Sequence, residues 1–138
     1  MAAGMEWLES AGLEEPGESG EQEVPAVFGA GDGNLANFLW DGRRVRIVDF
    51  EDSGRSDRVF ELAEITEHVG CWVEEPLDVA SFLGHFALTA AESAQLEKCR
   101  CLLALVWLFL LRFDEAGGRR NPPATADRQA DRLTALLR

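Results

Sequence analysis

The chain has 138 residues, 46% hydrophobic and 28% charged, so it can form one domain with its own core and has an ordinary globular composition. Its net charge of −12 and its lack of a basic stripe exclude nucleic acid as an expected partner, because a phosphate backbone would be repelled. The one long apolar run, Cys101 to Leu111, is shorter than the roughly 20 residues that span a bilayer, so no membrane partner is expected.

Residues 1–23 form an acidic lead-in. Residues 5–12 predict a short helix, and residues 13–23 (LEEPGESGEQE) have the composition of a flexible loop. This acidity would attract a cationic substrate, although it also simply favours solubility. Residues 1–42 contain no Lys or Arg and carry nine acids: Glu6, Glu9, Glu14, Glu15, Glu18, Glu21, Glu23, Asp32 and Asp41.

A glycine-rich loop and a β-hairpin follow the lead-in. A short extended segment, 24–28, enters the loop GAGDGN, whose glycines permit tight turns but, with no GK[ST] after them, give only a weak phosphate-binding signal. Two β-rich runs, FLW and RRVRIVDF, flank the dipeptide Asp41-Gly42, which is a strong two-residue turn signal. This turn would place Asn37 near Arg46, and the alternation of aliphatic and Arg residues predicts one buried and one wet face.

The rest of the sequence predicts helices. They are expected over 58–71 with Asp57 as cap, over 78–86, from a Thr89–Glu92 capping box to about Phe113 with an end at 117–118, and from Thr125 or Asp127 onward.

The cysteines and histidines suggest no site of their own. An odd count of three cysteines, Cys71, Cys99 and Cys101, predicts buried thiols in a reducing cytoplasm, and no signal peptide opens the chain. We therefore expect a cytoplasmic protein. His68 and His85 are interpreted as ordinary surface or boundary residues.

Three oxygen-bearing side chains are expected to converge at the open end of the hairpin. Asn37, before the first strand, and Asp49, at the end of the second strand, both lie towards this open end. Asp32 precedes Asn37 by five positions in the loop. Such oxygens suit Mg²⁺, which keeps several waters for a phosphate partner. The spacing Asp, four residues, Asn, then a hairpin and Asp-Phe is that of kinase-type catalytic loops. Frequent use of Asp and Asn in tight turns is the plain alternative.

The stretch GAGDGNLANFLWDGRRVRIVDFEDSGRSDRVFELAEITEHV resembles the core of the aminoglycoside phosphotransferase, or phosphotransferase enzyme, family. That family's motif is His-Gly-Asp, a few residues, Asn, then Ile-Asp-Phe, and the resemblance covers most of residues 24–138. It implies that Asp32 orients the substrate hydroxyl and acts as base. Asn37 and Asp49 would hold Mg²⁺, and Asp57 would help brace the loop.

The resemblance also implies a fold and a reaction. We expect a mostly helical α+β domain over 24–138, the C-terminal lobe of a protein-kinase-like fold with one small hairpin at the catalytic loop. The reaction would transfer the γ-phosphate of ATP to a hydroxyl of a small, cationic or sugar-like substrate.

The sequence departs from the family in two places. Alanine replaces the motif histidine at position 30, which removes a brace of the loop. No residue corresponds to the ATP-gripping lysine of the family's N-terminal lobe, since Lys98 alone is a lysine and it lies in a predicted helix. No ATP-binding residue is therefore assigned, and the N-terminal ATP-binding lobe is expected to be absent.

A second hypothesis follows from these departures: a truncated, non-catalytic fragment that acts as an interaction module. It would self-associate or bind a partner through an apolar surface around residues 28–50 and along part of the long helix. A third, an unrelated all-helical interaction module, must treat the motif as coincidence.

Overall fold

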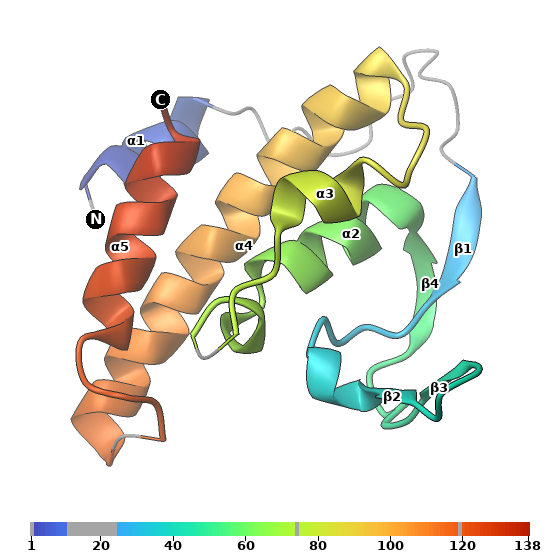
Figure 1. Cartoon of the computed structure of the whole chain (residues 1–138). Coiled ribbons are helices and arrows are strands. Elements are labelled where there is room, and N and C mark those ends of the chain that lie inside the picture. The colour runs from blue at the N-terminus through green and yellow to red at the C-terminus, as the bar shows by residue number, and fades with distance from the viewer. Residues whose placement is uncertain (1, 11–24, 74, 119) are drawn as a thin grey trace.

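The computed structural model describes residues 2–10, 25–73, 75–118 and 120–138; the expected loop at 13–23 lies outside them. The fold is α+β and mostly helical, with two small antiparallel sheets (Figure 1). In chain order the elements are α1 (Ala2–Ser10), β1 (Ala26–Gly29), η1 (Leu35–Asn37), β2 (Phe38–Trp40), β3 (Val45–Ile47), β4 (Gly54–Asp57), α2 (Arg58–Glu67), η2 (Val69–Cys71), α3 (Val79–Leu83), α4 (Ala90–Gly117) and α5 (Thr125–Leu136).

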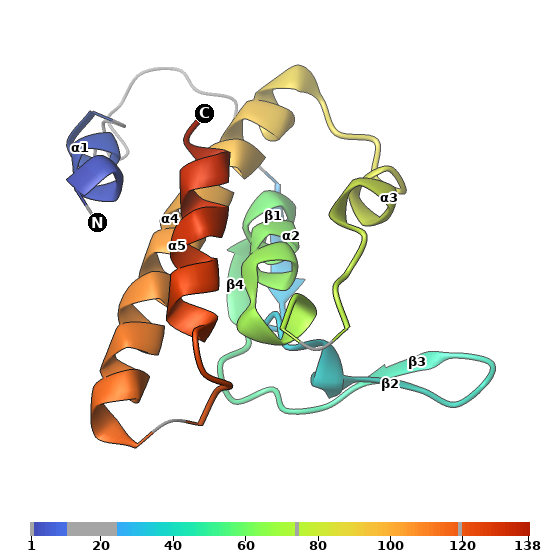
Figure 2. The ribbon, with the colours of Figure 1, turned by 60° about the vertical axis from the view of Figure 1, so that its left-hand side comes forward.

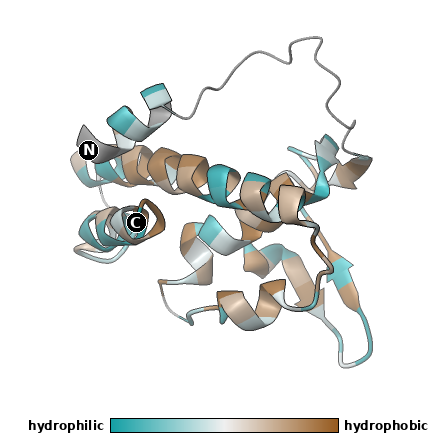
Figure 3. Ribbon diagram, turned by 90° about the horizontal axis from the view of Figure 1, so that it is seen from above, coloured by the Kyte–Doolittle hydropathy of each residue, from teal (hydrophilic) through white to brown (hydrophobic). Residues whose placement is uncertain are grey.

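The core lies where α4 packs between α2 and α5 (Figure 1). Apolar residues are frequent along much of α4, so that one part of this helix meets α2 and another meets α5 (Figure 3). Burying these side chains on both sides supplies the main favourable term for folding, at about 25 cal/mol per Å² of apolar surface. The buried apolar residues on α4 are Leu96, Cys99, Cys101, Leu103, Ala104, Leu105, Leu108 and Leu111.

Helices α2 and α4 begin at the predicted capping residues. The Asp57 carboxylate accepts hydrogen bonds from the N–H groups of Val59 and Phe60, and Thr89 and Glu92 form the expected reciprocal capping box. Helix α2 ends at Glu67, four residues before the expected boundary, and the 3₁₀ turn η2 continues it. Helix α4 continues past Phe113 and ends at Gly117 with Gly118 as its C-cap, at the glycine pair that the sequence predicted as its end.

A buried ionic cluster ties the three core helices together. Glu67 at the end of α2 is 0% exposed, and its carboxylate meets Arg100 of α4 at 2.7 Å and Arg132 of α5 at 3.0 Å. The guanidinium groups of Arg128 and Arg132 lie over the buried Trp72 ring, at 5.0 and 5.1 Å from its centroid. Paired in this way, the buried charge is compensated on both sides.

Strand β4 was not predicted from the sequence. It pairs antiparallel with β1, so that Ala26 lies opposite Asp57 and Gly29 opposite Gly54. The four residues of this strand, GRSD, include no β-branched or aromatic residue, which are the types that favour strands. The pairing therefore depends on the partner strand rather than on local propensity.

The hairpin β2–β3 forms, but its register and burial differ from the prediction. Gly42 and Arg43 occupy the turn and Asn37 lies opposite Val48, so the pairing is shifted by two residues. The shift preserves the faces, because side chains alternate with a period of two. The expected buried face is wrong: every residue of β3 is exposed, since the hairpin projects from the body of the molecule (Figure 2).

Within the described ranges, none of the helices has both the length and the apolar content that crossing a bilayer requires. The three cysteines are buried and unbridged, as predicted. Burial raises the pKa of the Cys71 thiol to about 11, so it stays protonated near neutral pH.

Candidate functional site

The loop between β1 and η1 holds Asp32 by two hydrogen bonds. Its Oδ1 accepts from the backbone N–H of Asn34 at 2.9 Å, and its Oδ2 accepts from Nδ2 of Asn37, also at 2.9 Å. Asn37 thereby keeps its own carbonyl oxygen for another partner, since its amide nitrogen faces Asp32. The structure thus brings together two of the three predicted site residues.

Asp49 is connected to Asn37 only through the hairpin backbone in the described structure. The N–H of Val48 donates to the carbonyl oxygen of Asn37 at 3.0 Å, so Asp49 follows directly after the last paired residue of the hairpin. Its φ of 62° is left-handed, which is uncommon for a residue with a side chain and is found at constrained sites. Within the described chain, no hydrogen bond or ion pair joins its exposed carboxylate to Asp32 or Asn37.

Two glycines of the loop are required by close packing. A Cβ at Gly31 would overlap the carbonyl oxygen of Asp52, and one at Gly33 would overlap the carbonyl oxygen of Glu64 in α2. Gly31 also has a φ of 74°. The Asp32 loop therefore packs closely against α2 and against the turn that follows Asp49. This close packing explains why glycines are needed here, and no phosphate-binding role is required to explain them.

Glu61 of α2 braces the backbone on the other side of Asp32. Its Oε2 accepts from the N–H groups of Ala30 at 3.0 Å and Gly31 at 3.5 Å, whereas its Oε1 is buried with no hydrogen-bond partner in the described structure. The predicted loss of a brace at Ala30 is therefore offset by a carboxylate from a neighbouring helix. Sequence reasoning missed Glu61; its helical spacing placed it on α2 without indicating which way it points.

Glu64 lies beneath the loop and has a strongly perturbed acidity. Burial, followed by the charges of Glu61 and Asp32, raises its pKa to about 7. The charges of Glu61 and Asp32 beside the loop make this region negative, which favours a cation. Among the described residues, however, no group of three or more His, Cys, Asp or Glu side chains is arranged to hold a metal ion.

His68 lies at the boundary between core and surface, as the sequence suggested, but it also faces Asp32. Its Nε2 lies 3.6 Å from Oδ1 of Asp32, and its ring stands edge-on to Trp107 with centroids 4.7 Å apart. Its Nδ1 accepts from the N–H of Gly70. His85 is exposed, as expected. The proximity of His68 to Asp32 arises from the tertiary fold, and local sequence patterns do not predict it.

Asp57 acts through secondary structure. Its side chain caps α2, and its backbone belongs to β4, opposite Ala26. It therefore fixes where α2 begins relative to the strand that leads into the Asp32 loop.

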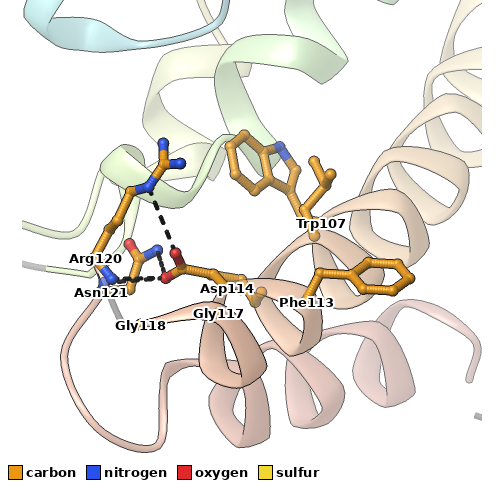
Figure 4. A pocket seen from close by; sticks show the side chains of 9 residues that line it. Trp107, Phe113, Asp114, Gly117, Gly118, Arg120 and Asn121 are labelled. Carbon is orange, nitrogen blue, oxygen red and sulfur yellow. Dashed lines mark hydrogen bonds and ion pairs between the residues drawn. The ribbon is translucent and has the colours of Figure 1, made fainter.

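A cavity of about 430 Å³ lies at the end of α4, beside Trp107 (Figure 4). Trp107, Leu110 and Phe113 contribute its apolar surface. Asp114 accepts from the backbone N–H of Arg120 at 2.9 Å, which lowers the pKa of its carboxyl group. This carboxylate therefore braces the chain after α4, and none of the three predicted site residues lines the cavity.

Chemically, the loop offers an ionisable carboxylate in a fixed orientation, an amide oxygen beside it, and a second carboxylate after the hairpin. All three donors are oxygens, the donor type that hard divalent cations prefer.

Comparisons of this chain with family models, with curated proteins and with solved structures found no match.

Proposed function

We propose that this chain is the catalytic-loop lobe of a kinase-like small-molecule phosphotransferase of the aminoglycoside phosphotransferase type. It would transfer the γ-phosphate of ATP to a hydroxyl group of a small, cationic or sugar-like substrate. The observation that carries the proposal is the hydrogen bond from Asn37 to Asp32, in a loop whose Asn37 also pairs through its backbone with the strand leading to Asp49.

The roles follow from the donors. Asp32 would orient the acceptor hydroxyl and take its proton, because its carboxylate is oriented by the loop yet 32% exposed. The carbonyl oxygen of Asn37 and the carboxylate of Asp49 would hold Mg²⁺, a fit supported by their oxygen chemistry. Bound there, Mg²⁺ would neutralise charge on the transferred phosphoryl group.

The test is a titration of Mg²⁺ and ATP, together and separately, into the purified chain, followed by calorimetry and by amide chemical shifts of residues 30–50. We expect Mg²⁺ to shift the signals of Asn37 and Asp49. Asp49→Asn should abolish these shifts, while Asp131→Asn, which changes an exposed acid on α5, should leave them intact. Identical responses of the two variants would refute the metal assignment.

A second candidate, an interaction module, is favoured by the exposed apolar side chains on and beside the hairpin. Trp40 is 65% exposed and Phe28 is 72% exposed. Large apolar side chains that are exposed near one another are typical of a surface that binds another molecule. The occupant we propose is a second copy of the chain, because three arginines of the hairpin, Arg43, Arg44 and Arg46, complement a molecule of net charge −12. Sedimentation of the chain at low and high salt tests this: a monomer under both conditions would exclude it.

A further inference from the structure

The His68 ring lies between the Asp32 loop and α4, and none of the proposed roles uses it. Its side chain is 12% exposed and packs against the Trp107 ring at an interplanar angle of 82°. Edge-to-face packing of this kind restricts the ring, so the direction of its nitrogens is set by the fold.

The hydrogen bonds of the ring identify its tautomer. Nδ1 accepts from the N–H of Gly70 at 3.0 Å, and an accepting nitrogen carries no proton in a neutral imidazole. The proton therefore resides on Nε2, which faces Oδ1 of Asp32. Burial lowers the pKa of His68, although the charge of Asp32 opposes this, so the neutral form is favoured at neutral pH.

The acceptor sites of Asp32 then fill unequally. An ionised carboxylate offers about four lone-pair sites, two on each oxygen. On Oδ1 one site takes the N–H of Asn34 and the other faces Nε2 of His68; on Oδ2 one site takes Nδ2 of Asn37. No described residue occupies the second site on Oδ2.

We propose that His68 is a positioning residue that holds Oδ1 of Asp32 through its Nε2–H, so that Oδ2 is the oxygen that accepts the proton of the substrate hydroxyl. This proposal rests on the proposed function. The present 3.6 Å separation is longer than a formed hydrogen bond, and catalytic hydrogen bonds commonly tighten when substrate binds.

The transfer step balances with His68 unchanged. The substrate oxygen bonds to the γ-phosphorus of ATP, and the bond from that phosphorus to the bridging oxygen breaks with its electron pair leaving on ADP. The hydroxyl proton moves to Oδ2 of Asp32, while His68 keeps its Nε2 proton throughout.

Nuclear magnetic resonance of the full chain without ligands tests the geometry. We expect His68 to show a protonated Nε2 and a bare Nδ1. His68→Phe keeps an aromatic ring beside Trp107 but removes the donor, so the Asn37 side-chain amide and the Asp32 carboxyl carbon should both shift. His68→Gln, which restores an N–H donor, should return them toward the wild-type positions. His85→Phe, an exposed-histidine control, should leave them in place.

Two further measurements keep the test decisive. Asp32→Asn should shift the His68 ring nitrogens, a result that needs no change at position 68 and so covers the case in which His68→Phe fails to fold. A proton on Nδ1, or unchanged His68 nitrogens in Asp32→Asn, would overturn the positioning role. In an active preparation, kcat should fall by about 10–100-fold in His68→Phe at unchanged KM, with partial recovery in His68→Gln.

Failure of this proposal and failure of the proposed function give different results. If the Nε2–H signature is present but Mg²⁺ and ATP do not bind, the phosphotransferase assignment fails, and with it the role of Oδ2 as proton acceptor. If Mg²⁺ and ATP bind but the signature is missing, the assignment stands and His68 has no positioning role.

Discussion

The helical body and the β2–β3 hairpin differ in what holds them. The body, α2, α4 and α5, buries apolar side chains on both sides of α4 and closes a charge cluster around Glu67, which is 0% exposed. The hairpin is held by backbone pairing of its strands and by the Asp41 side chain, which accepts a hydrogen bond from the turn. Its Trp40 and Val45 side chains are 65% and 53% exposed. Sheets of two strands are at best marginal alone, so the hairpin depends on the body for its position.

The Asp32 loop lies between these two regions and is pressed against α2. Substitutions in the body should therefore cost folding free energy, whereas substitutions in the hairpin should change contacts with other molecules.

Glu67→Ala should give the largest effect. It leaves Arg100 and Arg132 without their shared carboxylate in a partly buried site, so we expect a loss of about 3–5 kcal/mol in unfolding free energy. Urea unfolding measures it. Glu115→Ala is the matched control, because its partner Arg112 is exposed; it should cost less than about 1 kcal/mol. Equal losses in the two variants would mean that the buried cluster contributes nothing special.

Gly33→Ala should come second. Its Cβ would overlap the carbonyl oxygen of Glu64, so either the loop or α2 must shift, at about 1–3 kcal/mol. Gly54→Ala makes the same chemical change where nothing lies within 4 Å of the new methyl, so it should leave stability unchanged or slightly higher. Thermal unfolding of both variants provides the comparison. The amide signals of residues 31–37 should move in Gly33→Ala alone.

Glu64→Gln should give a smaller effect that depends on pH. The pKa of Glu64 is raised to about 7 in the folded chain, so its neutral form is favoured and folding loses stability as pH rises from about 4.5 to 7. Gln mimics the neutral form. After discounting for partial exposure, we expect the variant to be more stable than wild type by about 1 kcal/mol at pH 8 and equal to it at pH 4. A constant difference across that range would contradict the raised pKa.

Trp40→Ser should change stability least. The side chain is 65% exposed on the projecting hairpin, so its removal should alter unfolding free energy by no more than about 0.5 kcal/mol. Any self-association should weaken, as measured by sedimentation velocity across a concentration series. Leu108→Ser, at a buried position of α4, provides the contrast because it should destabilise the monomer strongly.

The sequence alone determined the parts of this protein that depend on neighbouring residues. The capping residues Asp57 and Thr89 set the starts of α2 and α4, and the hairpin formed where β-rich runs flank a turn. The local spacing also predicted that Asp32 and Asn37 lie close together, whereas their hydrogen bond was seen only in the structure. Such features are encoded by short-range hydrogen bonds and by periodicity, which a linear reading can follow.

Tertiary structure decided the rest. His68 reaches Asp32 across 36 positions. Glu67 is paired with arginines from two other helices. Strand β4 exists because β1 lies beside it, and the apolar face of the hairpin is exposed because nothing in the described chain packs on it. Each outcome depends on which surfaces meet in space, and residue pattern specifies that an amphipathic face needs a partner without specifying which one.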